Sequence, residues 1–271
     1  MTPQIAFIGA GNMARAMISG LLARGFSSDQ LRASDPSQGA RDAITALGVS
    51  QVSADPRACL TGANLAVLAV KPQVAPEALN EIAPALEGQT ALLSIAAGIT
   101  TETLANHVPV NTPIIRCMPN TPAMVGKGAT ALYAPDSVSQ NHRDLAQQVT
   151  EAVGLAIWVK AETLLDAVTA VSGSGPAYFF ALLEAMIDAG IHLGLDSDQA
   201  SALALQTALG AAELAQHSEH SVSDLRRQVT SPGGTTEAAL EALSEGDFSK
   251  IVATAMARCA ARAEALGKEF G

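Results

Sequence analysis

A glycine-rich turn near the N-terminus constrains the fold of this chain more than any other feature of its sequence. Residues 9–14 read Gly-Ala-Gly-Asn-Met-Ala and fit the pattern G-x-G-x-x-A. A short apolar run rich in β-branched residues precedes them at 4–8, and apolar residues recur at helical spacing over 12–24. A strand, a glycine turn and a helix in this order open a βαβ unit of the kind that binds a dinucleotide.

Strands and helices are expected to alternate from this turn to about residue 160. Apolar runs predict strands over 4–8, 31–34, 65–70, 91–96, 114–118 and 155–159, with 129–133 extending the sheet. Helical spacing predicts helices over 12–24, 76–86, 102–106 and 143–153. Continuous apolar runs are typical of parallel strands that are buried on both faces.

Beyond residue 160 the pattern predicts helices alone, over 176–193, 196–216, 224–229, 236–243 and 248–266. We therefore predict an α/β protein with an N-terminal Rossmann-like, mostly parallel sheet, followed by an all-α domain. The change of pattern predicts a dinucleotide-binding domain over residues 1–160 and a helical domain over 161–271.

The composition excludes several other classes of protein. The formal net charge of −10 argues against binding to nucleic acid, whose phosphates attract basic surfaces. The three cysteines have neither the spacing of a zinc site nor the even number of a disulfide framework, so we expect free thiols and no metal. Glu184 and Asp188 interrupt the best candidate for a membrane span, and the glycine turn breaks the N-terminal apolar run. We expect no membrane contact and a cytoplasmic protein.

Each residue of the glycine turn suits dinucleotide binding for a physical reason. Gly9 permits a tight turn, Gly11 lets the backbone approach a pyrophosphate, and the small Ala14 lets helix and strand pack closely. Asn12 and Met13 open the helix, whose free N–H groups face the phosphates. Gly9, Gly11, Asn12 and Met13 are therefore expected to bind the cofactor.

The end of the second predicted strand leaves the choice between NAD and NADP open. Asp35 lies near the position at which a carboxylate binds the ribose 2′-hydroxyl, which favours NAD. Ser34, Ser37 and Arg41 could instead serve a 2′-phosphate. Asp35 also suits a plain turn before Pro36. We expect cofactor contacts from Ser34 and Asp35 in either case.

Three further strand ends carry residues suited to a ligand. Ligands of an open parallel sheet collect at the carboxyl ends of its strands. We therefore expect cofactor contacts at the ends of three of the predicted strands, from Val70, Lys71, Pro72, Ala97, Gly98 and Asn120. Small residues there let ribose and nicotinamide approach the backbone. Lys71 adds a cation beside the expected anion, although a solvated surface lysine would look the same.

A segment rich in hydroxyl groups and glycine predicts an anion site in the second half of the chain. Residues 229–240 read Val-Thr-Ser-Pro-Gly-Gly-Thr-Thr-Glu-Ala-Ala-Leu, a turn that leads straight into a helix. Free backbone N–H groups at a helix start, with hydroxyl groups beside them, form a pocket for a small anion such as a substrate carboxylate. An ordinary capped helix start is the alternative, but this turn holds more glycine and hydroxyl residues than capping needs.

Five segments of the chain resemble the pyrroline-5-carboxylate reductase family. The strongest matches are residues 7–14, residues 167–178, which read Ala-Val-Thr-Ala-Val-Ser-Gly-Ser-Gly-Pro-Ala-Tyr, and residues 230–240. Residues 70–73 and 116–122 agree as well. The resemblance spans nearly the whole chain, and its last segment is quite specific.

The resemblance implies an activity, a cofactor and an assembly. It implies reduction of 1-pyrroline-5-carboxylate to L-proline, usually with NADPH, with NADH as a second candidate. It also implies a homodimer formed through the helical domain, with a decamer as a higher assembly. It places the substrate on Ser231, Gly233, Gly234, Thr235 and Thr236, with the Thr236 hydroxyl near the ring nitrogen in a catalytic role, and places Glu162 and Glu219 near the substrate amine.

Two other functions share parts of this pattern. A β-hydroxyacid dehydrogenase has the same two-domain plan, but it uses a lysine one or two turns after a glycine-rich segment. Here no lysine follows the glycine-rich residues 172–175 until Lys250. A non-catalytic nucleotide sensor is the other alternative, and the hydroxyl-rich segment at 230–240 argues against it.

Overall fold

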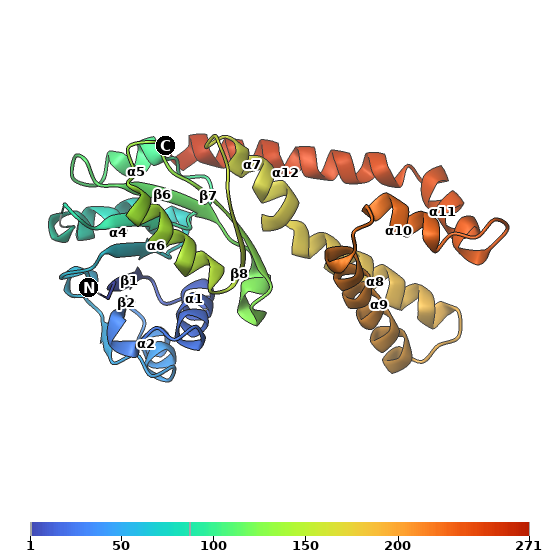
Figure 1. Cartoon of the computed structure of the whole chain (residues 1–271), viewed down its shortest axis with the longest axis horizontal. Helices are drawn as coiled ribbons and strands as arrows, with labels where there is room; N and C mark the ends of the chain where they lie inside the picture. Colours follow the sequence, from blue (N-terminus) through green and yellow to red (C-terminus); the bar gives the residue numbers. More distant parts are fainter. Residues whose placement is uncertain (1, 87, 271) are drawn as a thin grey trace. The chain divides into compact units, whose positions relative to one another are not determined.

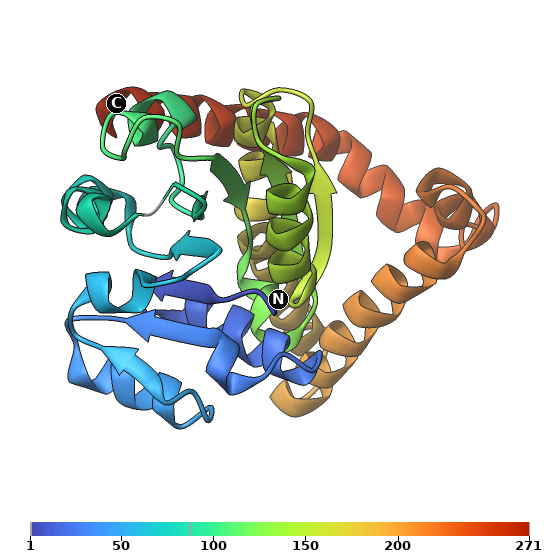
Figure 2. The ribbon, with the colours of Figure 1, turned by 60° about the vertical axis from the view of Figure 1, so that its left-hand side comes forward.

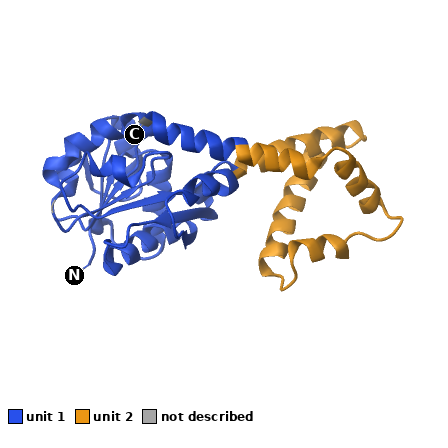
Figure 3. Cartoon of the chain, turned by 90° about the horizontal axis from the view of Figure 1, so that it is seen from above, with its two compact units in different colours: residues 1–174, 258–271 blue, residues 175–257 orange. Residues whose placement is uncertain are grey.

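The computed structural model of the chain describes residues 2–86 and 88–270, which form two compact units (Figures 1 and 3). The first unit comprises residues 1–174 together with the C-terminal residues 258–271, and the second comprises residues 175–257. The last strand of the first unit ends at Trp158, close to the predicted change of pattern near residue 160. The assignment of a separate function to each predicted domain remains a prediction.

The described residues of the first unit form one sheet of eight strands, which confirms the predicted mostly parallel sheet. The strands are β1 (Ile5–Ile8), β2 (Leu31–Ser34), β3 (Gln51–Ser53), β4 (Leu65–Leu68), β5 (Ala91–Ser94), β6 (Ile114–Met118), β7 (Gly128–Tyr133) and β8 (Gly154–Trp158). Their order across the sheet is β3-β2-β1-β4-β5-β6-β7-β8. Among these described strands, only the β6–β7 pair is antiparallel. The order reverses between β1 and β4, where ligands of such sheets bind.

Helices cover both faces of this sheet (Figure 2). The helices of the first unit are α1 (Asn12–Ala23), α2 (Gln38–Thr45), α3 (Pro56–Leu60), α4 (Ala75–Ile82), α5 (Thr101–Ala105), α6 (Gln140–Glu151) and α7 (Leu164–Val168). Ile5 and Phe7 of β1 share one buried cluster with residues of α1, α2 and α6. Ile8 belongs to the opposite cluster, with residues of α3, α4 and α5. Side chains that alternate between two buried faces explain why the strands read as continuous apolar runs.

The second unit contains helices and no strand in its residues 175–257, as predicted. The helices are α8 (Gly175–His192), α9 (Ser197–His217), α10 (Val222–Gln228), α11 (Thr235–Glu245) and α12 (Phe248–Phe270), whose C-terminal part belongs to the first unit. Asp196 and Gln199 form the predicted capping box at the start of α9. Helices α8 and α9 pack closely, and an added Cβ on Gly190 would lie 3.3 Å from that of Ala200.

Several short elements of the first unit were not predicted. Strand β3 has only three residues and lies at the sheet edge, where its side chains are exposed or half-buried and form no apolar run. Helix α2 has only eight residues and buries only Ile44, so it contains few apolar positions. After α7 the chain continues through a π-helical turn, Thr169–Gly173, which leads towards α8.

One helical stretch is long and apolar enough to cross a membrane by length and composition alone. It is Leu164–His192, the only such stretch in residues 2–86 and 88–270. Only 11% of its most apolar window is buried inside the chain. By length and composition, therefore, the charges of Glu184 and Asp188 do not exclude that this helix spans a membrane. An exposed apolar helix is equally typical of a surface that another subunit covers.

Candidate active site

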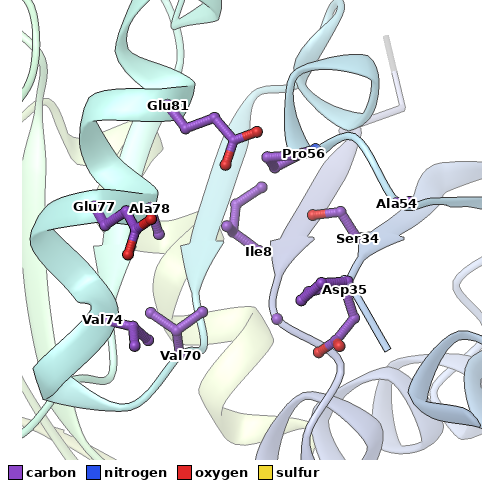
Figure 4. A pocket seen from close by; sticks show the side chains of 12 residues that line it. Ile8, Ser34, Asp35, Ala54, Pro56, Val70, Val74, Glu77, Ala78 and Glu81 are labelled. Carbon is purple, nitrogen blue, oxygen red and sulfur yellow. The ribbon is translucent and has the colours of Figure 1, made fainter. Parts of the chain in front are cut away.

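A cavity of about 410 Å³ lies at the carboxyl ends of β1, β2 and β4, beside the point where the strand order reverses (Figure 4). Four of the predicted cofactor residues line it: Gly9, Ser34, Asp35 and Val70. The lining is completed by Ile8, Pro36, Ala54, Pro56, Val74, Glu77, Ala78 and Glu81. Neighbouring parallel strands end at the same edge of the sheet, so residues far apart in the sequence meet here.

The turn after β1 has the tight conformation predicted for Gly9. Its φ is +100°, a value that residues with a Cβ rarely adopt. An added Cβ would lie 2.6 Å from the carbonyl oxygen of Ala69, so the turn touches the backbone that follows β4. The Gly9 N–H donates to the carbonyl of Ser34 over 2.8 Å, which ties the turn to the end of β2.

The start of α1 has the features that a pyrophosphate site requires. Gly11 is the N-terminal cap of α1, and no side chain caps the helix there. An added Cβ on Gly11 would meet no other atom within 4 Å, so the space beside the helix start is open. The exposed Asn12 and half-buried Met13 form the first turn, whose N–H groups have no intrahelical acceptor. This arrangement suits an anion at the N-terminus of α1.

Asp35 holds the backbone of the two loops that border the cavity. Its carboxylate accepts hydrogen bonds from the N–H of Ala10 over 2.9 Å and of Ser37 over 2.8 Å. The side chain of Arg41 donates to the carbonyls of Asp35 and Pro36, over 2.7 and 2.9 Å. Asp35 therefore forms the turn that was expected as the alternative to a cofactor contact. The carboxylate of Asp35 also lies at the cavity wall.

The predicted cofactor residues at the ends of β4, β5 and β6 differ in how much of each residue is exposed to solvent. Val70 is half-buried at the cavity, Lys71 is exposed, and Pro72 begins a short 3₁₀ helix, Pro72–Val74. Ala97 and Gly98 are half-buried in the loop between β5 and α5. Asn120 is buried after β6, where its amide nitrogen donates to the Ser172 carbonyl over 3.0 Å. Its amide oxygen accepts from the Ala129 N–H over 2.8 Å.

Glu162 is engaged inside the first unit. Its Oε1 accepts from the Thr101 N–H over 2.6 Å and from Nη1 of Arg116 over 2.7 Å. Its Oε2 accepts from the Thr101 hydroxyl over 2.8 Å. Arg116 is 7% exposed, so this ion pair is largely withdrawn from water. Arg116, Glu162 and Gly98 line a second cavity of about 240 Å³.

Asp166 also lines this second cavity. Burial raises the pKa of its carboxyl above the ordinary value, Arg116 opposes the shift, and the carboxylates of Glu264 and Glu162 add to it.

The hydroxyl-rich segment folds as predicted into a turn and a helix start in the second unit. Gly233 has φ +69°, and its N–H donates to the Glu237 carboxylate over 2.6 Å. The Gly234 N–H donates to the Ser231 carbonyl over 2.9 Å. Gly234 is the N-terminal cap of α11, and no side chain caps that helix. Thr235 and the half-buried Thr236 therefore stand at the start of α11, where backbone N–H groups remain for an anion.

Glu219 lies in the loop between α9 and α10, whereas the hydroxyl-rich turn lies between α10 and α11. The two loops thus flank α10, a helix of seven residues that is roughly 10 Å long. Glu219 is exposed, and no hydrogen bond joins it to Ser231 or Thr236 among the residues that the structure describes. His217 and His220 lie nearby, but the described residues contain no group that could hold a metal ion.

Sequence reasoning missed two parts of these sites. Ala54 and Pro56 reach the larger cavity from the unpredicted β3–α3 segment, while Glu77 and Glu81 reach it from α4. The Asp55–Pro56 pair was a usable signal, because Asp55 caps α3 through the Arg57 N–H. Arg116 was the second signal, since a charge within an apolar strand requires a buried partner.

Two segments of the chain match sequence profiles of known families. Residues 162–266 match pyrroline-5-carboxylate reductase dimerisation, and residues 4–98 match NADP oxidoreductase, coenzyme F420-dependent. The chain is also 46% identical over 270 residues to the pyrroline-5-carboxylate reductase of Pseudomonas aeruginosa, covering 100% of this chain and 99% of that one. The chain belongs to the pyrroline-5-carboxylate reductase family. The resemblance predicted from five sequence segments is thereby confirmed.

Other reductases of this family agree over their full length. The pyrroline-5-carboxylate reductase of Haemophilus influenzae is 42% identical, covering 98% of each chain. The solved reductase of Coxiella burnetii superposes with a TM-score of 0.93 at 38% identity, covering 98% of this chain and 99% of that one. The reductase of Plasmodium falciparum, solved with NADP bound, has a TM-score of 0.87 at 28% identity and covers 98% of each chain. The Rossmann-like fold with an NADP-binding domain is confirmed, and the reductase dimerisation domain implies a homodimer.

Proposed function

We propose that the protein reduces 1-pyrroline-5-carboxylate to L-proline, the last step of proline biosynthesis, with NADPH as the preferred hydride donor. The observation that carries this proposal is the match to reductases of one activity along the entire chain, at 46% identity in the case of P. aeruginosa. The β-hydroxyacid dehydrogenase alternative needs a lysine after the glycine-rich segment, and α8 (Gly175–His192) contains none.

The dinucleotide extends in this proposal along the carboxyl ends of the strands. Its adenosine half occupies the 410 Å³ cavity at Gly9, Ser34 and Asp35, and its pyrophosphate lies at the start of α1 beside Gly11. The open space at Gly11 and the uncapped first turn of α1 fit such a group. The nicotinamide end, which supplies the hydride, then points towards the loops that follow β5 and β6, where Ala97, Gly98 and Asn120 are further contacts in the proposal.

The substrate carboxylate is assigned to the turn before α11. Backbone N–H groups at the start of α11 and the hydroxyl groups of Ser231, Thr235 and Thr236 match its charge and size. Gly233 and Gly234 let the substrate approach the backbone closely. The Thr236 hydroxyl is placed near the ring nitrogen, where it orients the imine. Glu162 is not assigned to bind the substrate, because its carboxylate oxygens already accept hydrogen bonds from Thr101 and Arg116.

The reaction needs orientation and a proton balance, and no covalent enzyme intermediate. A hydride adds to the imine carbon, and the nitrogen carries a proton so that the product is the secondary amine. A protonated imine accepts hydride more readily than a neutral one, so a nearby carboxylate such as Glu219 favours the reaction by stabilising the cation. The protein otherwise contributes by holding the imine carbon against the donor.

A homodimer formed through the helical domain accounts for the exposed apolar surface of that domain. Phe179, Phe180 and Leu203 are between 58% and 64% exposed in the single chain. Water-exposed clusters of this kind mark a subunit interface. The dimerisation profile covers residues 162–266, which include the whole stretch Leu164–His192. We propose that the partner subunit covers this stretch in the cytoplasm, and a decamer is the higher assembly that the resemblance predicts.

An assay of coenzyme oxidation tests this function. The purified protein is mixed with 1-pyrroline-5-carboxylate and either NADPH or NADH, and L-proline is quantified. We expect proline from both coenzymes and a higher kcat/KM with NADPH. If a folded protein that binds NADPH forms no proline with either coenzyme, the proposal is refuted.

A further inference from the structure

The loop between β5 and α5, residues 95–100, is contacted on two sides by residues to which the proposed function assigns no ligand, Glu162 and Gly267. We propose that Glu162 and Gly267 are positioning residues, which fix this loop and thereby the alignment of the donor with the imine. The inference rests on the proposed function, because it assigns the loop to the nicotinamide end of the site. It gives Glu162 a role different from the substrate contact that the sequence resemblance predicted.

The first support comes from the carboxylate of Glu162. It accepts both the backbone N–H and the hydroxyl of Thr101, the first residue of α5, over 2.6 and 2.8 Å. Thr101 follows Gly98 by three residues, so fixing Thr101 also fixes the end of the loop. The Arg116 guanidinium in β6 holds the same carboxylate from the sheet side over 2.7 Å. Glu162 thus joins three segments that are far apart in the sequence.

The charge balance at Glu162 argues against a contact with the substrate cation. Arg116 is 7% exposed, and its positive charge neutralises the carboxylate at close range. A carboxylate paired in this way attracts an iminium ion weakly, since the pair has little net charge. Removing its charge would instead leave Arg116 buried without its partner, which is a structural cost.

The second support is a contact between two glycines on the other side of the loop. An added Cβ on Gly267 of α12 would lie 2.9 Å from the carbonyl oxygen of Gly98. Conversely, a Cβ on Gly98, whose φ is +82°, would lie 3.2 Å from the Gly267 nitrogen. The backbone of α12 therefore rests directly on the backbone of the loop, and any side chain at position 267 would press on the loop.

The topology explains why this loop matters for turnover more than for binding. With adenosine at the ends of β1 and β2, the dinucleotide crosses towards β5, so the loop after β5 borders the reacting end. The adenosine and pyrophosphate contacts lie at other strand ends and remain unchanged when the loop moves. A displacement of well under 1 Å at the reacting end lowers the rate, since transfer depends steeply on distance and orientation.

Replacement of Gly267 by alanine tests the glycine contact. Alanine favours a helix more than glycine does, which offsets part of the cost of pressing the new methyl group of G267A against the Gly98 carbonyl. We expect kcat to fall roughly three- to tenfold. The KM for the imine and the Kd for NADPH should stay within about twofold, because the substrate carboxylate and most of the dinucleotide are bound by segments that the substitution does not touch. E269A is the matched control in the same turn, where an exposed pair with Arg262 is lost, and it should retain the wild-type kcat.

Two variants of Glu162 test the carboxylate. E162Q keeps the size but has one acceptor oxygen for three donors, and E162D keeps the charge but is one methylene shorter. The positioning role predicts a lower kcat for both, with little change in the KM for the imine. A substrate contact predicts instead that E162Q raises this KM while E162D restores it, and that outcome would overturn the inference. A wild-type kcat for G267A and E162Q would overturn it too.

A measurement without turnover separates this inference from the proposed function. Amide hydrogen exchange of residues 95–105 should quicken in E162Q and G267A compared with E269A, since the loop loses its supports. If the wild-type protein reduces no imine but exchange still quickens, the proposed function fails and the structural supports stand. Unchanged exchange in both variants would contradict the supports themselves, and thermal unfolding of each variant shows whether it folds.

Discussion

Two glycines of the N-terminal turn should respond to alanine in opposite ways, although they lie two residues apart. Gly9 has φ +100°, and an added Cβ would lie 2.6 and 2.9 Å from the carbonyl oxygen and carbon of Ala69. Gly11 has φ −70° and ψ −174°, and an added Cβ would meet nothing within 4 Å. G9A should therefore damage the fold, whereas G11A should damage only the cofactor site.

The expected magnitudes follow from these contacts. An alanine with the backbone of Gly9 costs about 1–3 kcal/mol in conformational strain. The overlap with the Ala69 backbone adds about 1–3 kcal/mol. A loss of about 2–6 kcal/mol is a large part of the roughly 5–15 kcal/mol that stabilises a typical protein. For G11A, a poorer helix cap and a less flexible unfolded chain oppose each other, so the free energy of unfolding should change by less than about 1 kcal/mol.

Denaturant unfolding and NADPH titration of both variants provide the assay. G9A should unfold at a clearly lower denaturant concentration. G11A should unfold like the wild type but bind NADPH at least about tenfold more weakly, a loss of about 1.4 kcal/mol, because its methyl group occupies the approach of the pyrophosphate. Wild-type NADPH affinity in G11A, or equal destabilisation of the two variants, would refute the assignment of this turn.

Three further predictions concern the second unit and the smaller cavity. T236A should lower kcat/KM for the imine by roughly tenfold, about the value of one good hydrogen bond, with an unchanged Kd for NADPH; a loss of NADPH binding alone would show that the loop is misassigned. Burial raises the pKa of Asp166, so its ionised form costs stability. This cost is absent below the ordinary pKa of 3.8, grows as pH rises from there to the raised pKa of the folded state, and is complete above it. D166N should therefore raise the Tm at pH 7 but not in acid, and an unchanged Tm at pH 7 would contradict this. The third variant, L209E, introduces a charge at a position that is 52% exposed in the single chain and covered in the proposed dimer. Sedimentation should show that the dimer dissociates, and an intact dimer would place the interface elsewhere.

The fold could be predicted where one local pattern decided the structure. Strands β2 and β6 end at the residues that their apolar runs predicted, and Gly9 takes the tight turn that its motif requires. Strand β3 could not be found in this way, because pairing with β2 stabilises it and its three residues form no apolar run. A short edge strand depends on its neighbour more than on its own sequence.

The contacts of the site were less predictable, because they depend on long-range packing. Glu162 meets Arg116 and Thr101, which lie 46 and 61 residues earlier in the chain, and no periodicity relates them. The dimer interface depends on packing in the same way, because helical spacing alone does not tell which face of α9 is covered by the chain itself. Ala200 and Ala204 of α9 are buried within the single chain. Large aliphatic side chains such as Leu205 and Leu209 remain exposed and are the better candidates for the interface.

Reduction of the cyclic imine tests the central claim most directly. Purified protein receives NADPH and 1-pyrroline-5-carboxylate, and the loss of nicotinamide absorbance is compared with the L-proline formed. The same preparation is offered NADP⁺ and a 3-hydroxy acid. We predict one L-proline for each NADPH consumed and far slower oxidation of the hydroxy acid. Equal or faster turnover of the hydroxy acid, or an unreduced imine in the presence of folded, NADPH-bound protein, would contradict the assignment.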